Sequence, residues 1–238
     1  MIYEQFDFIN NDFNLKAFFS KRSIEEIFIP ILNRINEAAK SKEQFIVFLA
    51  APPATGKSTL AQLLETLGNQ HGIPIQALGL DGFHYPQQYL NTHYFMNNNQ
   101  EFLLSQVKGS PETYDVLKLM NAIEKKERLW PRYSRQIHDV IEGAIEIKHP
   151  ILLIEGNWLL LDEEPWIHLQ PDMTIFIEAK SELLKNRLID RKIKGGSSKK
   201  EATLFVEQSD LPNIDYVLTH SRSADIMLRL TEEYDYID

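Results

Sequence analysis

The sequence contains no cysteine, which excludes disulfides and thiolate chemistry and fits a reducing compartment. Long apolar runs are also missing, because none approaches the roughly 18 to 20 residues that a membrane-spanning helix needs. The first residues, MIYEQFDF, lack the basic-then-apolar order of a signal peptide. From these absences we expect a cytoplasmic protein without a membrane partner.

Positive charge is scarce, with 25 Lys and Arg residues against 34 Asp and Glu residues and a net charge of −9. A general nucleic-acid surface needs clustered Lys and Arg, so we expect no nucleic-acid partner. One segment has a positive net charge, since eight basic and only two acidic residues lie from position 180 to position 200. This basic island indicates an anionic ligand, for which the phosphates of a nucleotide would suffice.

The rest of the composition is that of an ordinary globular protein, with 43% hydrophobic and 25% charged residues. At 238 residues the chain can bury one sizeable core, so we expect a single domain. Apolar runs predict five strands, at residues 45–50, 73–80, 151–154, 173–177 and 215–218. Helical patterns separate these runs, which predicts a mainly parallel sheet with helices on both faces and a ligand crevice beyond the carboxyl ends of the strands.

The most informative stretch is FIVFLAAPPATGKSTL, residues 45–60, in which a strand pattern, a turn and a helix pattern follow one another. It matches the phosphate-loop consensus G-x-x-x-x-G-K-[ST] at Gly56, Lys57 and Ser58, but Ala51 stands at the first glycine position. We expect nucleotide contacts from Ala51, Pro52, Pro53, Ala54, Thr55, Gly56, Lys57, Ser58 and Thr59. Lys57 would reach the outer phosphates, and Ser58 would bind Mg²⁺. An ordinary strand-to-helix turn remains the alternative, and the Cβ of Ala51 could crowd the turn.

Two carboxylates follow predicted strands. Asp81 comes after the run 73–80 and lies where parallel sheets place their chemistry, although Asp81-Gly82 also fits a simple hairpin turn. Glu155 ends the run 151–154, the position of an acidic residue that holds Mg²⁺ directly or through water. Both carboxylates are therefore expected at the same edge of the sheet as Lys57.

The basic island has the features of a closing lid at residues 181–202. Arg187 and Arg191 are one helical turn apart and share a face. Gly195-Gly196 follows the charged helix and could act as a hinge. The alternative is a solvated, lysine-rich helix with a loose loop.

The ordered set of stretches APPATGKST, LDGFHYP, KGSPETYDV, WPRYSRQIHDV, ILLIEGNWLLLDEEPW and SDLPNIDYVLTHSRSADI resembles the P-loop small-molecule kinases that include phosphoribulokinase, uridine kinase and type I pantothenate kinase. Within that family it is most similar to the bacterial nucleoside/nucleotide kinase branch, which includes a proposed fructose transport system kinase. The resemblance implies an α/β P-loop NTPase fold with strand order 2-3-1-4-5 and a helical lid. It also implies transfer of the ATP γ-phosphate to a hydroxyl group, with Mg²⁺ as cofactor.

Carried over by position, Asp81 resembles the general base, and Arg187 and Arg191 resemble the lid arginines that stabilise the transferred group. The resemblance further implies that residues 85–140 bind the acceptor. The side chains implied for the acceptor are His84, just before this region, and Lys108, Tyr133, Arg135 and His138 within it, and Arg222 is implied for the nucleotide. One departure concerns Arg135, because pantothenate kinases have a histidine there. This arginine indicates either an acceptor with a negative group or a surface charge.

The main hypothesis is therefore an ATP-dependent kinase of a small metabolite, such as a sugar, a nucleoside, or a pantothenate-like or glycerate-like compound. The alternative is a nucleotide-binding regulatory or adaptor protein with little catalysis, which the Ala51 substitution motivates. A GTPase is disfavoured because no Asn-Lys-x-Asp motif occurs. We expect ATP and a small acceptor as partners and residues 1–44 as an N-terminal helical segment, and we leave a homodimer open.

Overall fold

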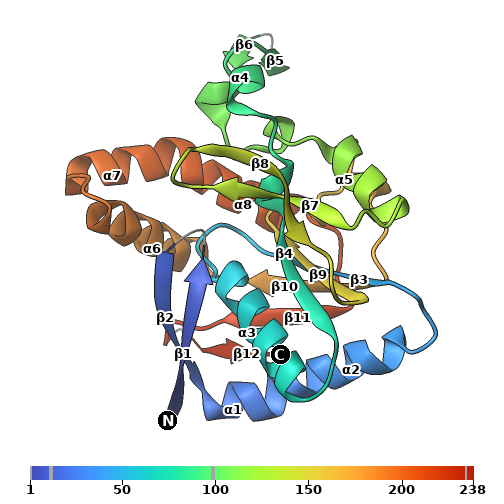
Figure 1. Cartoon of the computed structure of the whole chain (residues 1–238). Helices are drawn as coiled ribbons and strands as arrows, with labels where there is room; N and C mark the ends of the chain where they lie inside the picture. Colours follow the sequence, from blue (N-terminus) through green and yellow to red (C-terminus); the bar gives the residue numbers. More distant parts are fainter. Residues whose placement is uncertain (1, 11–12, 98–99, 234) are drawn as a thin grey trace.

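A six-stranded sheet crosses the centre of the computed structural model, which describes residues 2–10, 13–97, 100–233 and 235–238 (Figure 1). The strands lie in the order β12-β11-β10-β3-β9-β4. Their bounds are β3 Phe45–Ala50, β4 Ile75–Gly79, β9 Ile151–Gly156, β10 Met173–Glu178, β11 Ile226–Leu230 and β12 Tyr236–Ile237. Only β12 pairs antiparallel in this sheet, at its edge. Numbered along the chain, the five parallel strands have the order 2-3-1-4-5, which confirms the predicted topology.

The fifth parallel strand is β11, so the strand prediction at 215–218 was wrong. These residues belong to helix α8 (Leu211–His220), in which Ile214 and Val217 are buried three residues apart. A four-residue apolar run fits a buried strand or one face of a helix equally well, and here the helix is realised. The loop that carries Arg222 therefore precedes β11 at its amino end, opposite the edge where the predicted site lies.

The central strand β3 separates two hydrophobic cores. Its side chains alternate, so that Phe45, Val47 and Leu49 enter one core while Ile46, Phe48 and Ala50 enter the other. Helices α2 (Ile29–Ala39) and α3 (Lys57–Gln70) cover the first face. Helix α5 (Val116–Glu124) covers the second. Because both faces are buried, β3 is a continuous apolar run, and the prediction of helices on both faces is confirmed.

Residues outside the sheet form hairpins and helices around it. The hairpins in the predicted acceptor region are β5 (Tyr94–Asn97) with β6 (Gln100–Leu103), and β7 (Leu129–Ser134) with β8 (Asp139–Glu146). The other helices are α1 (Lys21–Ser23), α4 (Gln87–Leu90), α6 (Ser181–Lys194) and α7 (Lys199–Phe205), with a 3-10 turn at Leu80–Phe83. In the described part of the chain, every helix is too short or too polar to cross a bilayer.

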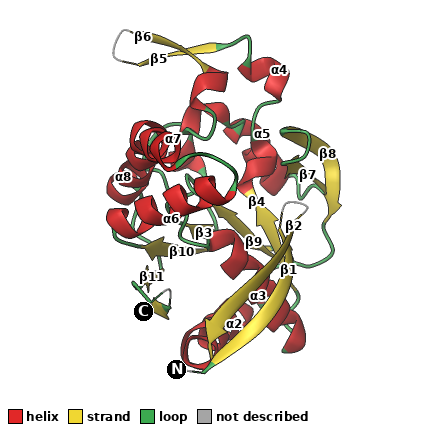
Figure 2. Cartoon of the chain, turned by 90° about the vertical axis from the view of Figure 1, so that its left-hand side faces the viewer, coloured by secondary structure: helices red, strands yellow, loops and turns green. Residues whose placement is uncertain are grey.

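The N-terminal segment is only partly helical, which corrects the prediction for residues 1–44. Strands β1 (Tyr3–Asn10) and β2 (Phe13–Ser20) form an antiparallel hairpin that lies beside α3 (Figure 2). Gln62 of α3 donates a hydrogen bond from Nε2 to the carbonyl oxygen of Ile9 at 2.8 Å. The helical part begins only at Lys21, where Ser20 is the N-cap.

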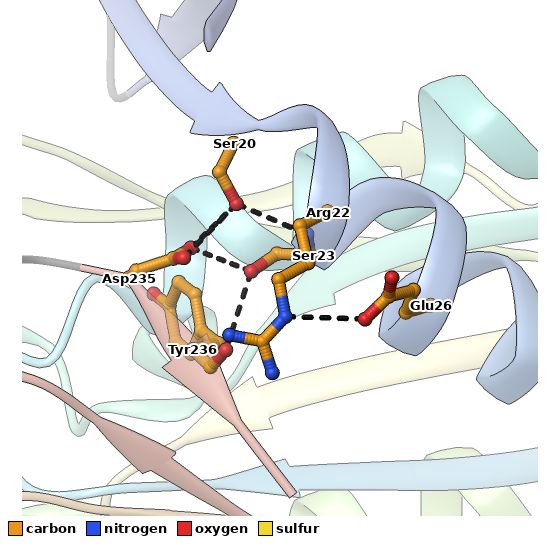
Figure 3. Close-up of polar contacts among 6 residues, drawn as sticks. All are labelled: Ser20, Arg22, Ser23, Glu26, Asp235 and Tyr236. Carbon is orange, nitrogen blue, oxygen red and sulfur yellow. Dashed lines mark hydrogen bonds and ion pairs between the residues drawn. The ribbon is translucent and has the colours of Figure 1, made fainter. Parts of the chain in front are cut away.

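The two ends of the chain are joined by a buried polar cluster around Asp235, which is 6% exposed (Figure 3). Ser20 and Ser23 donate hydrogen bonds from their hydroxyl groups to the Asp235 carboxylate. The Ser20 oxygen also accepts from the backbone N–H of Ser23 at 3.0 Å. Next to this cluster, the ring of Tyr236 packs edge-on against Phe28 with the centroids 5.5 Å apart. The short strand β12 thus anchors the N-terminal hairpin and helix to the central sheet.

We expect Asp235→Ala to lower the free energy of unfolding by roughly 3 kcal/mol or more, because two buried hydroxyl groups lose a charged acceptor. In a chain of this length, that loss corresponds to a drop in Tm of about 6 to 12 °C. Calorimetry measures the shift. The matched control is Asp238→Ala, an exposed carboxylate three residues away, which is expected to change stability by less than about 0.5 kcal/mol. Equal Tm values for the two variants would contradict the prediction.

Candidate active site

Residues 51–56 connect β3 to α3 through a turn that suits a bound anion. Ala54 and Gly56 have φ angles of +67° and +91°, a left-handed conformation in which successive N–H groups can converge. Glycine adopts it freely, whereas for Ala54 it costs roughly 1 to 2 kcal/mol. Thr55 closes the turn by donating from Oγ1 to the Pro52 carbonyl at 2.9 Å. Since α3 begins at Lys57, the free N–H groups of its first turn face the same space.

Ala51 does not strain this turn. It is fully buried in the core, and it is absent from the described residues with positive φ. Its backbone therefore has a conformation that any L-residue adopts, and its Cβ is accommodated by packing. The crowding that the sequence suggested at Ala51 is not found.

Tyr236 holds the same turn from the C-terminal end of the chain. Its Oη donates to the Thr55 carbonyl at 3.2 Å, and it lies 3.3 Å from where a Cβ on Gly56 would be. Burial raises the pKa of Tyr236 to about 12, so the hydroxyl stays protonated and remains a donor. No motif reveals this contact, because 181 residues separate the two partners.

Glu155, Lys57 and Ser58 meet at the carboxyl end of β9. The parallel register places Glu155 opposite Leu49 of β3 and Gly79 of β4. Lys57 Nζ lies 4.0 Å from Glu155 Oε2, and the side chains are 15% and 14% exposed. Burial raises the pKa of Glu155, while the charge of Lys57 and a hydrogen bond with Ser58 oppose that rise.

Asp81 follows β4 and enters the same cavity as Lys57. Tyr114 donates from Oη to Asp81 Oδ1 at 3.2 Å, and among the described residues nothing donates to the second carboxylate oxygen. Burial and the neighbouring Asp81 raise the pKa of Tyr114 well above its usual value, which keeps it a donor. Sequence reasoning assigned no role to Tyr114, since it lies 33 positions from Asp81 within the stretch KGSPETYDV.

Strand β7 approaches Asp81 closely because residue 82 is glycine. A Cβ on Gly82 would lie 2.3 Å from the carbonyl oxygen of Pro131 in β7. This approach brings Tyr133 to a side cavity of about 170 Å³ and Arg135 to the main cavity. Asp81 and Ser58 line both cavities, so the two spaces meet at these side chains.

The main cavity has a volume of about 740 Å³ and lies between the turn at 51–56 and helix α6. From α6 come Arg187, Asp190, Arg191 and Lys194. From the turn and α3 come Ala54, Gly56, Lys57, Ser58 and Thr59, and from the N-terminal hairpin Asn14 and Leu15. Arg135 and Arg191 both line this cavity, and burial and the nearby charge of Arg135 lower the pKa of Arg191.

Helix α6 ends before Gly195, and α7 starts anew at Ser198 with a capping box to Glu201. The glycine pair therefore separates two helices, as the lid prediction requires. Whether this segment closes over a ligand stays a prediction.

Of the predicted nucleotide contacts in and next to the turn, Ala51, Pro52, Pro53 and Thr55 line neither cavity, and elsewhere in the chain four more predicted ligand contacts lie outside both. Arg222 donates to the carbonyl oxygens of Ile167 and Leu169 at the opposite edge of the sheet, so its assignment to the nucleotide is wrong in this structure. The other three lie behind the residues that line the cavities. His84 stacks on Tyr114 with the ring centroids 3.8 Å apart.

Lys108 and His138 are placed behind Tyr133. Lys108 donates from Nζ to the His138 carbonyl oxygen at 3.0 Å and lies 4.8 Å from the centroid of the Tyr133 ring. Burial lowers the pKa of His84, which leaves its ring neutral. The side chains of His84 and Lys108 therefore contact Tyr114 and Tyr133 instead of lining the cavity, and His138 takes part through its backbone carbonyl.

The donor set fits the predicted Mg²⁺ ion. Mg²⁺ is usually held by one or two protein oxygens, with water and substrate phosphates completing the shell. The Ser58 hydroxyl and the Glu155 carboxylate are two such donors, joined by a hydrogen bond beside Lys57. In the described part of the chain, His, Asp and Glu residues form no cluster of three that could hold a metal by protein ligands alone. The site would thus bind the ion together with a nucleotide.

The chain is 38% identical over 235 residues to the uncharacterized protein YggC of Escherichia coli, with 95% of each chain covered. It is 28% identical to a pantothenate kinase of Enterococcus faecalis, with 90% of this chain and 83% of the relative covered. A proposed fructose transport system kinase from Silicibacter sp. TM1040 has a similar structure, with a TM-score of 0.75, 27% identity, and 84% of this chain and 98% of the other covered. No protein-family model matches the chain.

Proposed function

Because the chain belongs to the P-loop kinases of the uridine kinase, pantothenate kinase and phosphoribulokinase type, we propose that it transfers the γ-phosphate of ATP to a hydroxyl group of a small metabolite. One observation carries the proposal: Lys57 and Asp81 line the same cavity, with Arg187 and Arg191 on its opposite wall. A phosphate ligand, a base and converging cations are the groups that phosphoryl transfer requires.

The turn at 51–56 and the start of α3 form the nucleotide half of the site. Backbone N–H groups and Lys57 bind the β- and γ-phosphates, and Arg187 and Arg191 neutralise charge on the transferred group. Ser58 and Glu155 would hold Mg²⁺, which would draw charge from the phosphate oxygens. The cavity of about 740 Å³ is in the size range of small-molecule sites.

Asp81 belongs to the acceptor half. Its oxygen that faces the cavity takes the proton from the acceptor hydroxyl while that hydroxyl oxygen attacks the γ-phosphorus. The bond between the γ-phosphorus and the bridging oxygen breaks, and ADP leaves. Tyr114 fixes the carboxylate by its hydrogen bond to Oδ1. The side cavity of about 170 Å³ beside Asp81 favours a small acceptor.

A coupled ADP-release assay tests the proposal. The purified full-length protein is supplied with ATP and Mg²⁺ and with a panel of sugars, nucleosides, pantothenate and glycerate, and the product is identified by mass. We expect acceptor-dependent ADP release and a product heavier by one phosphoryl group. ATP binding by calorimetry, without transfer to any acceptor, would overturn the kinase proposal and favour a regulatory protein.

A further inference from the structure

Arg135 is an exposed cation that lines the main cavity. Its charge acts on two other groups there, the Glu155 carboxylate and the Arg191 guanidinium. It shares the cavity with Asp81 and lies close enough to Arg191 for the two positive charges to repel. Two neighbouring guanidinium groups are stabilised when an anion binds near both of them.

Arg135 comes from a different part of the fold than the cations expected at the nucleotide. Lys57 starts the helix after the phosphate turn, and Arg187 and Arg191 come from α6. Arg135 directly follows β7, the strand that also carries Tyr133 of the side cavity. Residue 135 begins the hairpin turn between β7 and β8, next to the strand that carries Tyr133. Arg135 therefore comes from the predicted acceptor region and lines the main cavity, whereas Tyr133 lines the side cavity.

The side cavity itself offers little for a negative group. Most of its wall is apolar or uncharged, formed by Ile9, Ala61, Ala77, Leu78, Pro131 and Ile145. Its one cation, Arg132, already has a partner. An oxyanion on the acceptor would thus be held at Arg135, while its hydroxyl group lies at Asp81, where the two cavities meet.

We infer that the acceptor is a small alcohol that carries an oxyanion, a carboxylate or a phosphate, and that Arg135 binds this group while the hydroxyl faces Asp81. The inference rests on the proposed kinase function and narrows its substrate class. Arg135 is a specificity-determining residue in this reading, since it binds a part of the acceptor that does not react. A guanidinium suits this task because its fork of N–H donors matches the oxygens of carboxylate and phosphate.

The test uses acceptors in matched pairs that differ in the charged group: glycerate and glycerol, pantothenate and pantothenyl alcohol, and ribose 5-phosphate and ribose. We expect the wild-type protein to favour the charged member of at least one pair by tenfold or more in kcat/KM. The pair that responds tells a carboxylate from a phosphate. Arg135→Gln is expected to lower kcat/KM for that charged acceptor by roughly 10- to 100-fold and to leave its neutral partner within about twofold.

Arg128→Gln is the matched control, because this arginine is exposed just before β7 and lines neither cavity. Its variant is expected to behave like the wild type. A drop that is equal for charged and neutral acceptors would assign Arg135 to the nucleotide and overturn the inference while leaving the kinase proposal intact. A preference for neutral acceptors would also overturn it.

A binding measurement separates this inference from the kinase proposal. The same six compounds are titrated calorimetrically into protein saturated with a non-hydrolysable ATP analogue and Mg²⁺. We expect the charged alcohols to bind to the wild type and to lose affinity by tenfold or more with Arg135→Gln. If they bind in this way without being phosphorylated, only the kinase proposal fails. If no charged alcohol binds, the inference fails.

Discussion

Asp81→Asn is expected to leave ATP binding intact and to lower phosphoryl transfer by roughly 10²- to 10⁴-fold, the range for loss of a general base. Asparagine keeps the shape of the side chain and can still accept the hydrogen bond from Tyr114. It cannot take up the proton of the acceptor hydroxyl. The loss should appear in kcat, while the Kd of ATP, measured by calorimetry, should stay the same or fall slightly because one negative charge near the phosphates is removed.

Asp162→Asn is a suitable control for this variant, because Asp162 is exposed in the loop after β9 and lines neither cavity. It should retain the full rate. An unchanged rate in Asp81→Asn would show that Asp81 is not the base. A parallel loss of ATP affinity would instead give Asp81 a role on the nucleotide side of the cavity.

The residues at the carboxyl ends of the parallel strands could be predicted because their placement depends on local sequence patterns. The run at residues 45–50 has the observed bounds of β3, and Gly56, Lys57 and Ser58 follow it at the spacing that a strand, turn and helix require. Parallel pairing then fixes Glu155 beside this turn, since all carboxyl ends share one edge. Lys57, Ser58 and Asp81 lie together around the main cavity for this reason, Arg187 and Arg191 reach it from the helix after β10, and Arg135 reaches it from the separate hairpin of β7 and β8.

The errors arise where local patterns do not settle the structure. Residues 215–218 fit a strand and a helix face equally well. Because they were predicted as a strand, the loop with Arg222 was also predicted at the wrong end of the sheet. The hairpin of β1 and β2 escaped prediction because its stability depends on α3 and on the buried Asp235 cluster, which are remote in sequence. Tyr114 and Tyr236 were missed for the same reason, since each acts on a partner in another part of the chain.

Two of these contacts between distant parts of the sequence hold the walls of the main cavity in place. Tyr236 holds the Thr55 carbonyl of the phosphate turn, while the adjacent Asp235 holds the start of the helical segment that follows the hairpin. The hairpin in turn contributes Asn14 and Leu15 to the wall of the main cavity. The C-terminal strand β12 thus fixes two walls of the cavity at once, so we regard it as part of the scaffold of the site.

Lys57→Ala is expected to weaken ATP binding and to slow transfer, in contrast to Asp81→Asn. Lys57 is the cation that lies beside Glu155 at the start of α3, so its removal takes positive charge from both the bound phosphates and the transition state. We expect a drop in turnover of roughly 10²- to 10³-fold, the range for removal of one preorganised electrostatic group. The Kd of ATP should rise together with it.

The comparison of the two variants carries more information than either alone. Lys125→Ala, at an exposed lysine where α5 ends, is the control for a loss of surface charge and should match the wild type in both Kd and rate. Because Glu155 loses its neighbouring cation in Lys57→Ala, a melting curve should accompany the assay to show that the protein is folded. A folded Lys57→Ala protein with normal ATP affinity and normal turnover would show that the turn at 51–56 does not hold the reacting phosphates, whatever the result at Asp81.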